Sequence, residues 1–135
     1  MIRKLIQLPT AVFVGACALM AVGTAIYAAD GAKEAATAAQ HATLASRAAD
    51  IDQTHMHLHH VVNCLVGPNG EGFDASAANP CKALGNGAIP DTSNSATKAT
   101  LMDALKTANA GLASDDLKTA KTDAAKTAAI LKKVK

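Results

Sequence analysis

The densest group of chemically versatile side chains in this sequence is a cluster of histidines. Four of the five histidines fall in the six-residue run HMHLHH at 55–60, and the fifth is His41. Imidazole is a common ligand for zinc, copper, nickel and iron, and its charge changes near neutral pH. The run therefore predicts ligation of a metal ion or haem, and pH sensing is a related alternative.

Helical geometry divides this run into two half-sites. Residues four apart lie on one face of a helix, so His55 and His59 point to the same side, with Asp52 a further turn back. These three side chains border the apolar stripe, and His55 and His59 are the expected primary ligands. His57 and His60 point to the opposite side and are further candidates. For each histidine the alternative is an ordinary packing residue or a solvated position.

Three other residues could extend these half-sites. His41 shares the angular position of His59 but lies about 27 Å away along an unbroken helix, so it could join only through a bend or a second molecule. His60 stands one turn before Cys64, which could ligate a metal only if it is not bridged. Met56 and His59 form a Met-x-x-His pair, a spacing that suits soft monovalent copper or silver. Since a closed zinc site needs four ligands, the rest must come from a loop, another chain or water.

Sequence signatures of catalysis are missing. The chain has no nucleophile elbow, no Gly-rich phosphate loop opening a helix and no His-Glu-x-x-His, so we expect no enzyme. Cys-x-x-Cys-His, which attaches haem covalently, is also missing. Haem held without a covalent bond is an alternative, with Met56 or Met102 as axial partner, although a chain with so few aromatic residues makes a poor haem pocket.

A long amphipathic helix is expected to carry the histidines. Leu44, Ile51, Leu58, Val62 and Leu65 recur at helical spacing, which predicts one helix over about 31–66. Such a helix would be about 54 Å long, and a small domain rarely contains one. A bend or a homo-oligomer would accommodate it.

The segment 67–92 is rich in Gly, Pro and Asn, which are typical of turns and loops. Cys64 precedes this segment and Cys81 lies in its middle. In an oxidising compartment two cysteines most often pair. We therefore expect a disulfide that staples the loop and contributes roughly 3 kcal/mol, with metal ligation by one or both thiols as the alternative.

Two further amphipathic helices are expected at about 93–110 and 115–133, as an antiparallel hairpin. The fold class is therefore all-α. We expect a single domain over 29–135, a three-helix bundle that becomes a four-helix bundle if the first helix breaks. Its long disulfide-stapled loop lies between the first helix and the C-terminal hairpin.

The N-terminal segment 1–28 has the pattern of a cleavable secretory signal. Arg3 and Lys4 precede an uncharged apolar stretch, and small residues allow a cut after Ala28 or Ala29. The expected location is the periplasm. Cys17 lies in a loose lipobox, so lipidation is an alternative, and it is the only expected route to a membrane.

Charge and aromatic content argue against a nucleic-acid partner. Of the 13 Lys and Arg residues, Arg3 and Lys4 belong to the expected signal, so 11 basic residues face 11 acidic ones in the rest of the chain. Phosphate-binding surfaces need clustered positive charge, and single-strand binding needs stacking aromatics. Phe73 is the only aromatic residue after position 28.

The chain resembles small exported bacterial helical proteins that sequester metals, through its Ala- and Lys-rich helices, few aromatics and histidines on a helix face. The stretch LKTANAGLASDDL at 105–117 is similar to the helical repeats of small periplasmic metal-binding proteins. Those proteins spread histidines along all their helices, whereas here the last two expected helices have none, which favours one local site. The resemblance implies a buffer or carrier for copper, nickel or zinc. The alternative is a non-catalytic interaction or stress-response module that uses the stapled loop as its contact surface.

Overall fold

The computed structural model describes residues 29–135, so the expected signal segment and Cys17 lie outside the described residues. Helices account for all the regular structure of this part of the chain, and it contains no strand, which confirms the all-α fold class. None of these helices is long and apolar enough to cross a membrane. The helices are α1 (Gly31–Arg47), α2 (Ile51–Val66), α3 (Ala88–Asp91), α4 (Ser95–Leu112) and α5 (Leu117–Leu131).

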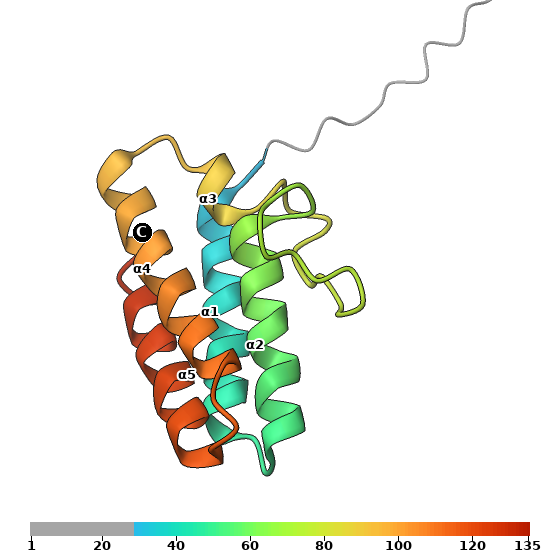
Figure 1. The fold of residues 1–135 in the computed structure, drawn as a ribbon. Coiled ribbons are helices and arrows are strands. Elements are labelled where there is room, and N and C mark those ends of the chain that lie inside the picture. The colour runs from blue at the N-terminus through green and yellow to red at the C-terminus, as the bar shows by residue number, and fades with distance from the viewer. Residues whose placement is uncertain (1–28) are drawn as a thin grey trace, which may run out of the picture.

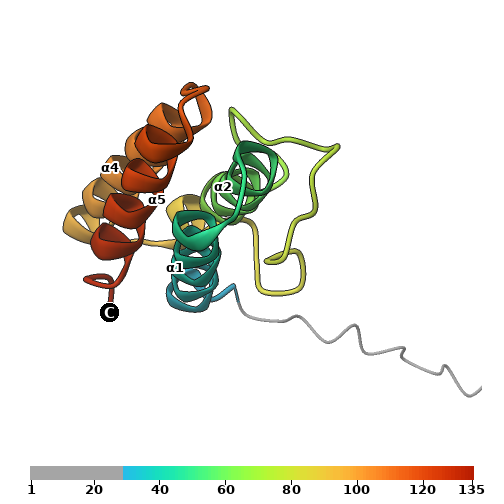
Figure 2. The same ribbon diagram turned by 90° about the horizontal axis from the view of Figure 1, so that it is seen from below.

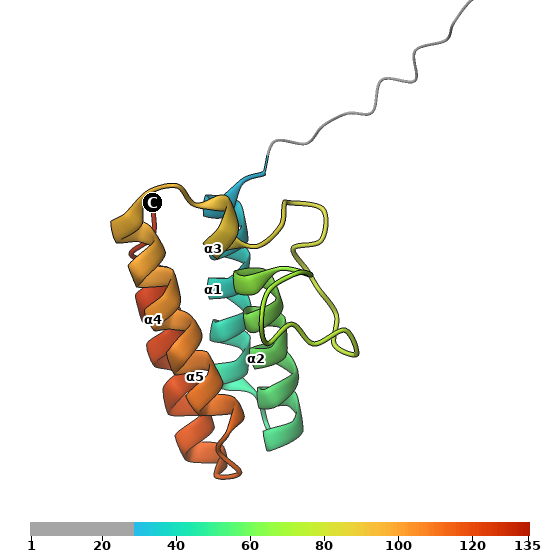
Figure 3. The same ribbon diagram turned by 45° about the horizontal axis from the view of Figure 1, so that its top comes forward.

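The four long helices form a bundle in which successive helices run in opposite directions (Figure 1). Viewed from below, α1 and α2 make one pair, and α4 and α5 make the other (Figure 2). The most extensive packing joins α1 to α2, α1 to α5 and α4 to α5. The short helix α3 lies at the end of the bundle where α1 begins and α2 ends (Figure 3). The four-helix alternative is therefore the one that the structure shows.

The single helix expected over 31–66 is two helices, because the chain turns between Arg47 and Ile51. Asp50 caps the start of α2: its Oδ1 accepts a hydrogen bond from the backbone N–H of Gln53 at 2.8 Å, and Gln53 Nε2 donates to Oδ2 at 2.8 Å. An N-cap side chain satisfies backbone donors that lack a partner within the helix. Lys121 of α5 donates to the carbonyl oxygen of Ala48 at 2.8 Å. The turn makes α1 and α2 antiparallel neighbours.

Alanine forms the apolar buried side of α1, and leucines of the other helices supply most of the bulk of the core. Because alanine ends at Cβ, helices that meet through it can approach closely. Close approach also brings together the longer side chains at the edge of the α1–α2 interface. The buried alanines of α1 are Ala35, Ala38, Ala39, Ala42 and Ala45. The fully buried leucines are Leu58, Leu65, Leu101 and Leu131.

The long loop between α2 and α3 closes on itself at its base. Gly67 ends α2 with φ +68°, and Gly87 has φ +116°. A Cβ on Gly67 would collide with the carbonyl of Asn86, and one on Gly87 would collide with the backbone of Gly67, so both positions require glycine. The Cys64–Cys81 disulfide is buried and ties the loop to α2, as expected from the sequence.

Candidate metal centre

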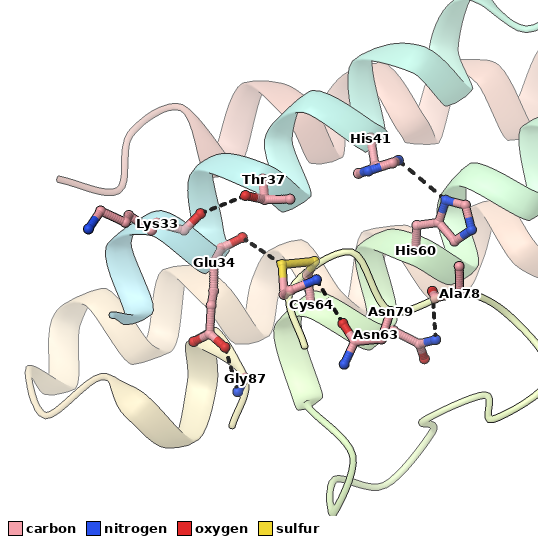
Figure 4. Close-up of a disulfide and its surroundings, with 11 residues drawn as sticks. Lys33, Glu34, Thr37, His41, His60, Asn63, Cys64, Ala78, Asn79 and Gly87 are labelled. Carbon is pink, nitrogen blue, oxygen red and sulfur yellow. Dashed lines mark hydrogen bonds between the residues drawn. A yellow bond between two sulfur atoms is a disulfide. The ribbon is translucent and has the colours of Figure 1, made fainter. Parts of the chain in front are cut away.

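Three histidines from two helices converge at the edge of the α1–α2 interface, and we call them the histidine triad: His41, His57 and His60. Nδ1 of His41 lies 3.4 Å from Nδ1 of His57 and 3.3 Å from Nδ1 of His60. All three rings are partly buried, and one nitrogen from each lies within 4.8 Å of the others. Figure 4 shows His41 and His60 facing each other across the two helices. The triad is thus within metal-binding distance.

Two of the three nitrogen separations in the triad match those of a tetrahedral metal site. Zinc–nitrogen bonds are about 2.0–2.1 Å long, so two of them at the tetrahedral angle place their nitrogens about 3.3–3.4 Å apart. The two Nδ1 contacts of His41 have these lengths. A neutral imidazole nitrogen carries either one proton or one lone pair, so Nδ1 of His41 cannot make a good hydrogen bond to both neighbours at once. A metal ion would accept a lone pair from each ring.

The surroundings of the triad lower the pKa of two of its imidazoles, His41 and His60. Burial lowers the pKa of His41, and the neighbouring rings of His60 and His57 lower it further. Burial also lowers the pKa of His60, followed by the effects of His57 and His59. A metal ion binds the neutral form of imidazole. A lowered pKa therefore leaves these rings ready to bind at neutral pH.

The half-site of His55, His59 and Asp52, expected from the sequence to hold the primary ligands, is not among the converging groups of ligand atoms in the described part of the chain. His55 Nε2 donates to the carbonyl oxygen of Ser114, 3.0 Å away in the turn between α4 and α5. His59 Nδ1 lies 3.2 Å from Oδ2 of Asp74 in the stapled loop. Asp52 is exposed in the first turn of α2. His55 and His59 connect α2 to its surroundings, whereas the other half-site, His57 and His60, meets His41.

Asn63 positions the loop segment that faces His59, a role that was not predicted from the sequence. Its side chain is fully buried; Nδ2 donates to the carbonyl oxygens of Asp74 at 2.9 Å and Ala78 at 3.2 Å, and Oδ1 accepts from the N–H of Asp74 at 2.8 Å. Hydrogen bonds from Ser76 lower the pKa of the Asp74 carboxyl, so this carboxyl is ionised beside His59. An asparagine inside the apolar run VVNCLV of a helix was the available signal.

A second buried ionisable group lies on α1, two turns before His41. The Glu34 side chain is fully buried; Oε1 accepts the N–H of Gly87 at 2.9 Å, while Oε2 has no hydrogen-bond partner. Burial raises the pKa of Glu34 to about 7 and the nearby Asp91 carboxyl adds to this, although the Gly87 bond acts in the opposite direction. Figure 4 shows this carboxyl and the disulfide near the same stretch of α1. Cys64 and Cys81 are bridged, so neither offers a thiol to the triad.

Comparisons with protein-family models, curated proteins and solved structures find no match for this chain. The geometry of the triad therefore carries the functional assignment.

Proposed function

We propose that this protein binds one transition-metal ion, from among copper, nickel and zinc, through the three imidazoles of the histidine triad. It serves as a buffer or carrier of that ion and has no catalytic role. The observation that carries the proposal is that three imidazole nitrogens, one from each ring, lie within 4.8 Å of one another. Two of the Nδ1–Nδ1 pairs have the separation expected at a tetrahedral metal ion.

The proposed location is the periplasm, after removal of the segment 1–28. The buried Cys64–Cys81 disulfide supports an oxidising compartment, where such bonds form and persist. The secretory pattern of the first 28 residues supports export. A metal-binding protein there meets ions that enter from the environment.

Metal titration of the mature, disulfide-bonded protein tests the proposal. We expect one zinc or nickel ion per chain at pH 7.5. Because each lost imidazole removes one of only three protein ligands, His41→Ala and His57→Ala should each weaken binding at least about a hundredfold. The matched control is His55→Gln, on the same helix but bonded to Ser114, which should leave the affinity within about threefold.

Two outcomes would reject the triad as a metal site: no binding tighter than about 10 µM, or an equal loss of affinity in the His55→Gln control. Elemental analysis and an absorption spectrum of material isolated from the periplasm test the haem alternative. A Soret band with stoichiometric iron would replace the proposal with a haem protein.

The pH profile of binding is a second signature. Because the pKa values of His41 and His60 are lowered from 6.5, these rings are neutral at pH 7 and protons compete only in acid. We expect the zinc affinity to be nearly constant above about pH 7 and to fall below about pH 6, by about tenfold per pH unit for each proton that the metal displaces. An affinity that continues to rise between pH 7 and 9 would point to ligands other than these imidazoles.

A further inference from the structure

The histidine triad leaves one position of a tetrahedral metal ion open. Within residues 29–135, no Cys, Asp or Glu joins the three imidazoles in the group whose ligand atoms lie within 4.8 Å. Cys64 is bridged, and the carboxylate of Asp74 is bonded to His59 and Ser76. Four-coordinate ions then take water or another side chain. We propose that the thioether of Met56 is the fourth ligand, and that the ion bound is monovalent copper; this inference rests on the proposed function.

Met56 stands at the right place on α2 for this role. It directly precedes His57 and lies one turn before His60, and residues four apart on a helix have Cβ atoms about 5–6 Å apart. At about 100° per residue, Met56 lies only about 40° around the helix from His60. Long side chains of a helix lean toward its N-terminus, so the ring of His60 leans over the turn that contains Met56. The methionine side chain has three rotatable bonds, with which its sulfur can approach the open position while the backbone stays in place.

Core packing does not account for a methionine at this position. Met56 is 45% exposed on a helix whose core is made by other residues, so turning its side chain toward the triad disrupts little packing. Its neighbours on the exposed side of the first turns, Asp52 and Gln53, are polar. In the described part of the chain, the other exposed large hydrophobic residues are Leu44 at 48% and Met102 at 57%.

The donor set then determines the metal. Imidazole binds zinc, copper and nickel, whereas a thioether is a soft ligand that favours monovalent copper and adds little for zinc. Three imidazoles with one thioether therefore select the monovalent copper ion. The same three imidazoles without the sulfur would bind zinc with water in the fourth position.

The test compares monovalent copper with zinc in two matched variants. Copper is supplied without oxygen as its acetonitrile complex, with no thiol reductant, so that the disulfide stays closed, and its affinity is measured by competition with a coloured copper(I) chelator. Met56→Leu should weaken copper(I) binding by about tenfold or more and leave zinc affinity within about twofold. Met102→Leu, an equally conservative change at an exposed methionine of α4, should alter neither. X-ray absorption at the copper edge should show one sulfur neighbour, which Met56→Leu removes.

Three results would overturn the role of Met56: unchanged copper(I) affinity in Met56→Leu, a sulfur signal that survives this change, or zinc binding without copper(I) binding in the unaltered chain. In each case zinc binding that depends on His41 would leave the three-histidine site intact. Loss of the His41 dependence would instead reject the proposed function. Far-UV circular dichroism of the Met56→Leu and Met102→Leu proteins is the control for folding, and only folded variants are compared.

Discussion

The two helical hairpins of this bundle pack through similar residues but differ in the polar and ionisable side chains that they carry. Both α1–α2 and α4–α5 are antiparallel pairs whose contacts use many alanines and a few leucines. All five histidines and the buried Glu34 lie in the first pair, and the disulfide holds the loop that follows it. The second pair has no histidine or cysteine. The two pairs thus share a packing scheme and differ in the histidines, the buried carboxyl and the disulfide that only the first pair has.

The α4–α5 pair stabilises the pair that carries the histidines. Burial of polar groups such as Glu34 and Asn63 costs free energy unless every polar atom is bonded, and Oε2 of Glu34 is not. The α4–α5 pair offsets this cost through apolar burial at Leu101 and Leu131 and through its contacts to α1. It also holds the first pair at two points, through Ser114 to His55 and Lys121 to Ala48.

The disulfide should give the largest difference between the hairpins. Replacing Cys64 and Cys81 together by Ala should cost roughly 3 kcal/mol of the free energy of unfolding, because the bridge restricts the unfolded chain. Urea unfolding followed by circular dichroism measures this. Hydrogen exchange should show the loss of protection concentrated in the loop and the end of α2, with α4 and α5 protected until global unfolding. A uniform loss across all helices would show that the hairpins unfold as one unit.

Glu34 should give the next largest effect, and only at neutral and alkaline pH. Its pKa is raised to about 7 in the folded protein, so the folded state binds this proton more tightly than the unfolded state. The resulting stability is full below about pH 4.5 and declines as the pH rises to about 7. Since one pKa unit corresponds to about 1.4 kcal/mol, we expect Glu34→Gln to stabilise the protein by about 2 kcal/mol at pH 8 after relaxation, and to have little effect at pH 4.

Thermal unfolding of the two chains at several pH values measures this difference. His41 and His60 act in the opposite sense, since a lowered pKa makes stability fall as the pH drops below 6.5. Both chains carry these histidines, so subtracting the two profiles isolates Glu34. A difference that does not depend on pH would mean that Glu34 stays in one protonation state throughout.

Replacing one buried threonine in each hairpin should give the smallest effect on the free energy of unfolding, and a similar one in both hairpins. Thr54 in α2 and Thr127 in α5 are both fully buried, and each hydroxyl donates to the carbonyl oxygen four residues earlier at 2.8 Å. The shape of valine matches that of threonine, and the carbonyl oxygen of Asp50 keeps its hydrogen bond from the backbone N–H of Thr54. We expect Thr54→Val and Thr127→Val each to change the free energy of unfolding by less than about 1 kcal/mol. A large cost at Thr54 alone would show that the N-terminus of α2 is more constrained than its counterpart in α5.

Most of the fold could be predicted from the sequence because its signals are local. The spacing of apolar residues predicts helices, and the Gly- and Pro-rich segment predicts the loop. The two cysteines, one just before this segment and one in its middle, predict the bridge. The turn at Asp50 also had a local signal, since Asp50 followed by Gln53 is a typical helix start. The unbroken apolar pattern on both sides concealed it.

By itself the sequence determined that the histidines gather in one short run, and it predicted a helical chain whose loop is closed by a disulfide. Only the tertiary structure decided which histidines meet. The angular position of a residue predicts its neighbours on the same helix only, and from it His55 was paired with His59. His41 is 16 residues from His57 and 19 from His60, so their contact exists because the chain reverses at Asp50 and α1 packs against α2.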